Sequence, residues 1–157
     1  MKRIIYILAA VFLAAGFSSC SGTKDAGVDI SGQWHLVETG DLIEGQGLDI
    51  DVYASFSSGT FALYQKVGSG LVRYWYYEGS YSVSGDNVLT GRYSDGTRLG
   101  GTRGLGYAVD LSGSQLTLTS MASGEVSVYE QAEIPADVIG NAVPPVRSGD
   151  AVALPVL

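Results

Sequence analysis

The chain has 157 residues, with nine basic side chains, 16 acidic side chains and one cysteine. Its formal net charge of −7 repels phosphate backbones, so nucleic acid is not an expected partner. The single cysteine has no partner within the chain for a disulfide. A content of 22 glycines and ten tyrosines is typical of short strands joined by tight turns.

The first 20 residues have the parts of an export signal. A basic start over residues 1–3 is followed by an apolar run over 4–17, shorter than the about 20 residues of a transmembrane helix. Two serines then precede Cys20. We expect residues 1–19 to be a lipoprotein signal peptide and the Cys20 thiol to carry the lipid. The alternative is an ordinary signal peptide, with Cys20 left as a free thiol or removed.

The remaining chain is long enough for one domain. Without the first 19 residues, 138 remain, and they carry seven basic and 16 acidic side chains, a net charge of −9. Residues 20–29 are small and polar without periodicity, which predicts a flexible, lipidated tether. Membrane attachment is therefore expected through the lipid and not through a basic surface.

From residue 30 onward, apolar and polar side chains alternate with period two for about a hundred residues. The pattern predicts eight strands, over 30–38, 49–57, 60–67, 71–83, 87–94 and 105–111 and around 116–118 and 126–128. Short turns between most neighbours favour an all-β, eight-stranded antiparallel up-and-down barrel over 30–140. A two-sheet sandwich is the alternative. Gly79, inside the fourth strand, suggests a bulge or a sharp bend.

The last part of the chain does not continue the alternation of apolar and polar residues. Residues 136–139 are compatible with one helical turn, and 141–157 form a Pro-containing C-terminal tail. Its last seven residues, 151–157, are apolar, and we expect them to pack on the barrel or to cap an opening. A disordered tail is the alternative.

Aromatic side chains are the best candidates for a binding site. One set shares the inward face with the aliphatic residues: Trp75, Tyr77, Tyr81, Tyr93 and Tyr107. The interior of an eight-stranded barrel is either packed solid or holds one small ligand, so core packing is the alternative. A second set is predicted on the outer face: Tyr53, Tyr64, Tyr74, Tyr76 and Tyr129. Such patches mark protein or sugar contacts, with scattered surface tyrosines as the alternative.

The chain offers little catalytic chemistry. His35 is the one histidine, and it has no evident acidic partner or metal-binding companion. Asp49 and Asp51, with Glu44 nearby, are interpreted as the solvent-facing side of a strand, although paired carboxylates also serve acid–base work or calcium. No Gly-x-Ser-x-Gly elbow is present. We therefore expect no enzyme activity, catalytic residue, metal or cofactor.

Gly32-Gln33-Trp34 opens the first predicted strand, where lipocalins carry Gly-x-Trp. With residues 32–37, 60–66, 77–83, 89–96 and 128–138, the chain resembles the lipocalin-like lipoproteins of Bacteroidetes over most of 30–140. The resemblance implies that Trp34 plugs one end of the barrel. Lipocalins proper place Arg or Lys near the last strand, but residues 126–134 contain neither, so the resemblance is to the lipocalin-like group and not to the ligand carriers.

Together these features predict a non-catalytic barrel that is lipid-anchored in the cell envelope, on the periplasmic or surface face of the outer membrane. Its expected ligand is a small apolar or amphipathic molecule, bound by the inward aromatic set together with Trp34. The alternative is a protein-interaction or inhibitor module that contacts an envelope protein through the outer aromatics and loops.

Overall fold

The computed structural model describes residues 26–39, 49–68, 73–100, 103–145 and 157. Cys20, Glu44, the predicted signal peptide, most of the tether and residues 146–156 of the predicted tail lie outside the described residues. Among the residues that are described, no helix has the length and hydropathy needed to cross a bilayer.

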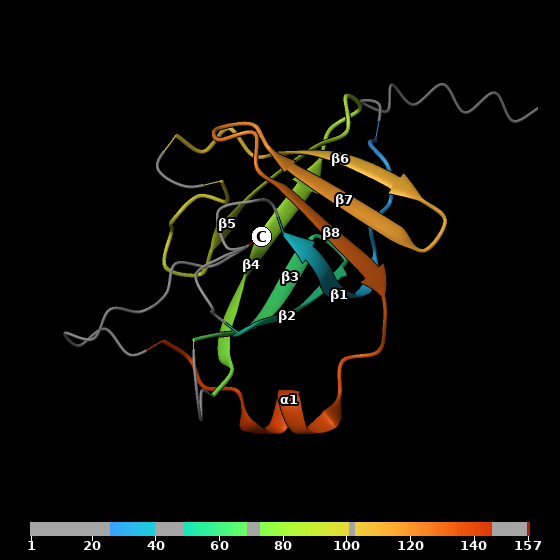
Figure 1. Cartoon of the computed structure of the whole chain (residues 1–157). Helices are drawn as coiled ribbons and strands as arrows, with labels where there is room; N and C mark the ends of the chain where they lie inside the picture. Colours follow the sequence, from blue (N-terminus) through green and yellow to red (C-terminus); the bar gives the residue numbers. More distant parts are fainter. Residues whose placement is uncertain (1–25, 40–48, 69–72, 101–102, 146–156) are drawn as a thin grey trace, which may run out of the picture.

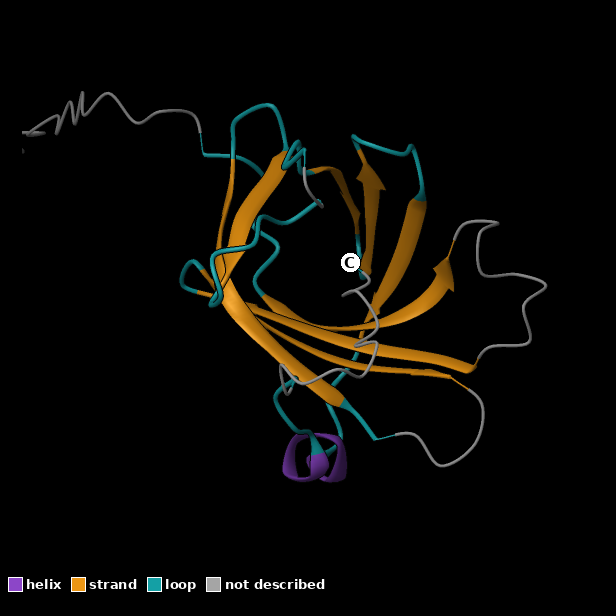
Figure 2. Ribbon diagram, turned by 90° about the vertical axis from the view of Figure 1, so that its left-hand side faces the viewer, coloured by secondary structure: helices purple, strands orange, loops and turns teal. Residues whose placement is uncertain are grey.

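Eight strands form a closed antiparallel barrel, in which each strand pairs with the next and the last returns to the first (Figures 1 and 2). They are β1 (Gly32–Thr39), β2 (Asp49–Ser57), β3 (Thr60–Gly68), β4 (Trp75–Val83), β5 (Val88–Tyr93), β6 (Tyr107–Ser112), β7 (Gln115–Ser120) and β8 (Val126–Gln131). The predicted all-β, eight-stranded barrel is thus confirmed in place of a sandwich. A short helix, α1 (Ala136–Asn141), follows β8.

The two ends of the barrel differ in their connections. At one end, here called the tight-turn end, short turns join β2 to β3, β4 to β5 and β6 to β7. The first of these contains Ser58 (φ 50°) and Gly59 (φ 79°), the left-handed pair of a two-residue hairpin turn. The other end, the long-loop end, holds the connections from β1 to β2, β3 to β4, β5 to β6 and β7 to β8.

The interior is built from side chains at alternate strand positions, as the sequence pattern predicts. In β2 and β3, the inward residues Val52, Ala54, Phe56, Phe61 and Leu63 are all buried. Towards the tight-turn end, Trp34 is 3% exposed, and its indole Nε1 donates a hydrogen bond to the Ile30 carbonyl at 3.0 Å. The indole is thereby buried without an unpaired donor, which fixes the start of β1 against the core.

Gly79 does not form a bulge, so this part of the sequence-based prediction is wrong. It pairs in regular register with Phe61 on β3 and with Tyr93 on β5. A Cβ at this position would lie 2.6 Å from Phe61 Cε1 and 2.0 Å from the Arg92 carbonyl oxygen. The glycine is required because the Phe61 ring and the β5 backbone approach the β4 backbone too closely for a side chain.

The segment after β8 packs on the outside of the barrel. Ile134 and Val138 are 4% and 3% exposed, yet they do not belong to the cluster of core residues inside the barrel. Beyond α1, Val143 N donates to the Tyr74 carbonyl at 3.0 Å, and Tyr76 N donates to the Val143 carbonyl at 2.8 Å. The C-terminal segment therefore pairs with the start of β4, where β5 does not reach, and α1 lies outside the ring of strands, at the bottom of Figure 1.

Candidate functional site

The inward aromatic residues lie in the two halves of the barrel. Tyr81 lies near the tight-turn end, where its ring meets Phe56 edge-on with centroids 5.0 Å apart. Tyr77, Tyr93 and Tyr107 lie at the long-loop end, since they belong to the start of β4, the end of β5 and the start of β6. The predicted binding set, with Trp34, is thus divided, and its long-loop part is the candidate site.

Trp75 is less buried than its neighbours on the inward face. It lies opposite Gln65, whose side chain is fully buried, so Trp75 belongs to the inward face as predicted. Its own side chain is half-buried, and it is not among the residues that pack against the core cluster, which include Tyr77, Tyr81 and Tyr93. Trp75 therefore lies at the rim of the candidate site.

Edge-to-face contacts hold the tyrosines of the candidate site in place. The Tyr93 ring meets the Phe61 ring at 82° with centroids 5.3 Å apart, and it meets the Tyr77 ring at 68° with centroids 6.1 Å apart. This geometry places the positive edge of one ring against the negative face of the next. Tyr107 is 9% exposed and also receives a hydrogen bond from the Gly100 backbone.

Tyr129 also faces the interior, where it interacts electrostatically with Tyr93 and Tyr107, and the prediction that it faces outward is wrong. Its side chain is fully buried opposite Leu116, which is also fully buried. Both faces of β8 carry apolar residues, so alternation alone does not decide which face points inward. The pairing with β7 decides it, and Val126 and Val128 face outward instead, with Val126 38% exposed.

The Tyr129 hydroxyl is a buried polar group without a partner. Among the described residues, it is the one buried side-chain nitrogen or oxygen that makes no hydrogen bond. Leaving such a group unpaired in an apolar interior costs about 1–3 kcal/mol. A molecule that accepts a hydrogen bond from this hydroxyl would remove that cost.

The phenols of the site act on one another and remain neutral. Burial raises the pKa of Tyr93 far above its usual 10, and the neighbouring Tyr107, Tyr129 and Tyr77 raise it further. Burial likewise raises the pKa of Tyr129, with Tyr107 as the second cause. Four phenols are thus gathered in one region of low dielectric, where a phenolate is disfavoured. Each of the four hydroxyl groups can therefore donate a hydrogen bond to a ligand at neutral pH, unless it already donates to another group of the protein.

Leu157 occupies the long-loop end of the interior. Its side chain is 5% exposed and belongs to the core cluster, and its carbonyl lies 3.5 Å from the Ser127 hydroxyl, which donates to it. The end of the chain accordingly lies inside the ring of strands in both views (Figures 1 and 2). The expectation that the apolar tail packs on the barrel is confirmed for Leu157, whereas residues 151–156 lie outside the described residues.

On the outer face, four rings follow one line across four strands. His35, Tyr53, Tyr64 and Tyr76 are direct cross-strand neighbours from β1 to β4. His35 stacks on Tyr53 with centroids 4.4 Å apart, and Tyr64 contacts Tyr76 at 5.3 Å. The predicted outer positions of the tyrosines on β2 to β4 are therefore confirmed, and cross-strand contacts of this kind stabilise the sheet.

Asp51 is the polar centre of this outer row. Its Oδ1 lies 2.9 Å from His35 Nε2, and its other oxygen accepts a hydrogen bond from the Tyr74 hydroxyl. The expectation that His35 lacks an acidic partner is therefore wrong, because strand pairing brings together residues 16 positions apart. Burial and the bond to Asp51 raise the pKa of Tyr74, and Lys66 Nζ lies 5.7 Å from its ring centroid. The Asp49 side chain lies outside the described residues.

The C-terminal segment lies close to this outer row. The charge of Asp137, in α1, contributes to raising the pKa of both Tyr53 and Tyr74, after the larger effects of burial and of Asp51. All the rings of the row are only half-buried, and the polar atoms of His35 and Tyr76 are bonded to Asp51 and Glu78 of the same chain. Over the described ranges, no group of three or more His, Cys, Asp or Glu side chains is arranged to hold a metal ion.

Comparison with known proteins adds no family assignment. No family model matches the chain, and neither a curated protein nor a solved structure matches it significantly.

Proposed function

We propose that the protein is a non-catalytic binding barrel, which holds a small amphipathic molecule in the long-loop half of its interior. The observation that carries the proposal is the fully buried Tyr129 hydroxyl, which has no hydrogen-bond partner. Three further inward tyrosines, Tyr77, Tyr93 and Tyr107, lie in the same region. The apolar surroundings favour a ligand with an apolar body, and the phenols favour one with a hydrogen-bond acceptor.

The position of Leu157 supports a proposal for the chemical class of this ligand. A branched aliphatic side chain is accommodated among core residues, and the adjoining carbonyl oxygen accepts a hydrogen bond from Ser127. An aliphatic chain that ends in a carbonyl or carboxylate combines the same two features. A fatty acid is the simplest molecule of this class, and its head group would accept a hydrogen bond from the Tyr129 hydroxyl.

The proposal includes a location. A lipid on Cys20 would hold the barrel at the cell envelope, where amphipathic molecules are plentiful. The support is the sequence of residues 1–20, a basic start and an apolar run before a cysteine, together with a β-domain that begins shortly after them.

Contact with another envelope protein through the outer aromatic row is the second candidate, and the geometry favours it less. The rings of His35, Tyr53, Tyr64 and Tyr76 contact one another, and the hydroxyl of Tyr76 is bonded to Glu78 at 2.7 Å. The rings of this row, with the polar atoms of His35 and Tyr76, are thus engaged within the chain, whereas the buried Tyr129 hydroxyl has no hydrogen-bond partner.

Extraction of the purified protein tests the proposal without prior choice of a ligand. The protein is purified from envelopes without added lipid, extracted with organic solvent and analysed by mass spectrometry, in parallel with Tyr129→Phe. We expect one class of carbonyl-containing amphiphile with the unchanged protein and several-fold less with the variant. Equal amounts of the same molecules from both proteins would contradict the role of Tyr129.

A further inference from the structure

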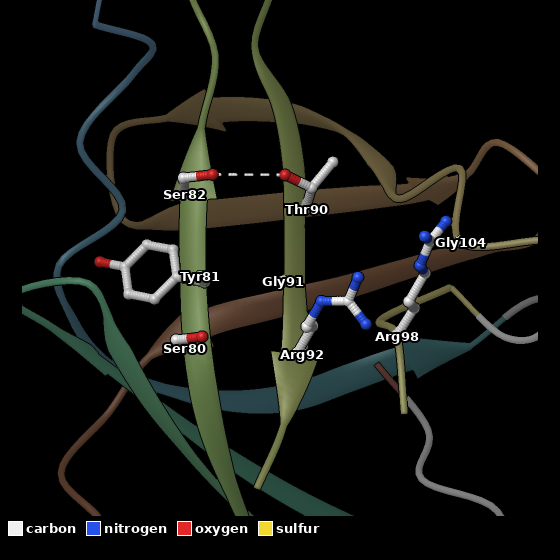
Figure 3. A pocket seen from close by; sticks show the side chains of 8 residues that line it. All are labelled: Ser80, Tyr81, Ser82, Thr90, Gly91, Arg92, Arg98 and Gly104. Atoms are coloured by element: carbon white, nitrogen blue, oxygen red, sulfur yellow. Dashed lines mark hydrogen bonds between the residues drawn. The ribbon is translucent and has the colours of Figure 1, made fainter. Parts of the chain in front are cut away.

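A polar hollow lies on the outside of the barrel, over β4 and β5, away from the interior site. Its floor consists of outward side chains in direct register, Ser80 opposite Arg92 and Ser82 opposite Thr90. The Ser82 and Thr90 hydroxyl oxygens lie 3.3 Å apart, as Figure 3 shows. The hollow has a volume of about 380 Å³.

Arg98 forms the wall of this hollow, and its backbone is fixed beside β5. Tyr93 N donates to the Thr97 carbonyl at 2.8 Å, and Leu99 N donates to the Gly91 carbonyl at 3.0 Å. The segment thus takes the place beside β5 that β6 leaves open, because β6 pairs only with Val88 and Leu89. Arg98 is thereby set opposite Arg92 as an antiparallel bridge partner.

Two close packing contacts keep this segment in position. Leu99 is 1% exposed and lies over Gly91, where a Cβ would come within 2.6 Å of Leu99 Cδ1. Gly104 lies against the Arg98 side chain, so that a Cβ there would be 2.4 Å from Arg98 Cδ. The backbone position of Arg98, whose side chain is exposed, therefore depends on a buried leucine and two glycines.

The charges of the hollow are unusual for this chain. Two arginines are bridge partners on a protein with a net charge of −7, and like charges opposite each other destabilise a sheet. Within the described segments, the one ion pair joins His35 and Asp51, so no carboxylate pairs with either arginine. Arg92 Nη1 donates only to the Gly96 carbonyl, at 3.2 Å. The nearby Asp95 carboxylate accepts a hydrogen bond from Thr97 N.

We propose that this hollow binds a tetrahedral oxyanion, the phosphate or sulfate group of a larger molecule. The planar donor arrays of Arg92 and Arg98 fit two oxygens of such a group each, and the hydroxyls of Ser80, Ser82 and Thr90 reach further oxygens. At about 30 Å³ per water molecule, the hollow has room for roughly a dozen waters, so the anion and part of its carrier fit.

Calorimetry and thermal unfolding test this site with glycerol 3-phosphate as the probe. We expect saturable binding that weakens about tenfold or more in Arg98→Gln, because charged hydrogen bonds are lost. Arg103→Gln is the matched control, since Arg103 is an exposed arginine of the same loop that does not line the hollow, and its affinity should stay within about twofold. Arg98→Lys keeps the charge without the planar donor array and should bind with intermediate affinity.

The unfolding temperature without anion reports on folding. Arg98→Gln should unfold at the same or a higher temperature than the unchanged protein, because the repulsion from Arg92 is relieved, and it should lose the upward shift caused by the probe. Equal weakening of binding in Arg98→Gln and Arg103→Gln would overturn the proposal.

Vesicles distinguish the source of the anion. Vesicles of phosphatidylcholine with phosphatidate are compared with phosphatidylcholine alone, using protein without the N-terminal lipid. Binding to the phosphatidate vesicles that Arg98→Gln abolishes would identify a lipid head group. Binding of glycerol 3-phosphate without vesicle binding would identify a soluble ester. Both results support the site, and failure of both probes overturns it without affecting the interior site.

Discussion

At the scale of single residues, the glycines of this chain differ in what surrounds their Cα atoms. Gly79 has the Phe61 ring and the Arg92 carbonyl within 2.6 Å of the position that a Cβ would take. Gly140, in α1, has no heavy atom within 4 Å of that position. The same added methyl group therefore has opposite consequences at the two sites.

We expect Gly79→Ala to lower the free energy of unfolding by about 1–3 kcal/mol, because the β4 backbone must move away from Phe61 and β5. Gly140→Ala should leave the free energy unchanged or raise it by up to about 1 kcal/mol, since alanine favours the helix. Urea denaturation followed by tryptophan fluorescence measures both. Equal effects of the two substitutions would show that the contacts around Gly79 do not limit the packing.

The phenols give the protein a defined response to alkaline pH. Burial and the hydrogen bond to Glu78 raise the pKa of Tyr76 to about 12, and burial raises the pKa values of Tyr93 and Tyr129 further. In the unfolded chain these groups titrate near 10. Above pH 10 the unfolded state loses protons that the folded state keeps, so its free energy falls relative to the folded state.

The contribution of these tyrosines to the free energy of unfolding should therefore be constant below pH 10. It should fall as the pH rises from 10 to 12. Urea denaturation at pH 9, 10 and 11, with phenolate absorbance recorded in parallel, measures this. The phenolate signal of the buried tyrosines should appear only with unfolding. A stability that increases above pH 10 would be incompatible with the burial of these phenols.

At the scale of elements, residues 97–99 behave as a short extra strand beside β5. Leu99 anchors the segment in the core, and Arg98 depends on that anchor for its place beside Arg92. We expect Leu99→Ala to cost about 2–5 kcal/mol of unfolding free energy and to weaken the binding of glycerol 3-phosphate. Leu105→Ala is the control, since Leu105 belongs to the same loop but is 47% exposed. If Leu99→Ala folds and binds glycerol 3-phosphate as tightly as the unchanged protein, the site does not depend on the position of residues 97–99.

The elements also show how far the sequence alone leads. Alternation of apolar and polar residues predicts all eight strands, and β2 is predicted with its observed bounds. It fails for β8, where valine and tyrosine occupy opposite faces and only the register with β7 decides which points inward. It also fails for residues 97–99, because a single buried leucine in a glycine-rich loop has no periodicity.

The residues of the candidate site are likewise predicted from the sequence only in part. Tyr77, Tyr93 and Tyr107 are predicted from alternation, because their strands have one clearly apolar face. The inward position of Tyr129, on which the proposal rests, is not predicted. The contact between Leu157 and Ser127 is not predicted either, because it spans 30 residues and depends on closure of the barrel. Likewise, the pairing of His35 with Asp51 requires the register between β1 and β2.

At the scale of the whole molecule, the proposed lipid on Cys20 would determine where the barrel acts. Labelled palmitate should be incorporated by cells that express the unchanged chain and not by cells that express Cys20→Ser. The thiol is the only one in the chain, so no other cysteine can substitute for it. Ser19→Ala serves as the control and should retain the label. Label that persists in Cys20→Ser would contradict the proposed anchor.

The closed barrel buries the unpaired Tyr129 hydroxyl in its interior, near the phenols of Tyr93 and Tyr107. The most direct test of this account is a calorimetric titration of dodecanoate into the unchanged protein, Tyr129→Phe and the outer-face control Tyr64→Phe. We expect binding that Tyr129→Phe weakens about tenfold, while its unfolding free energy without ligand rises by about 1 kcal/mol because the unpaired hydroxyl is gone. Tyr64→Phe should bind like the unchanged protein. Absence of binding, or equal affinity in Tyr129→Phe, would contradict the account.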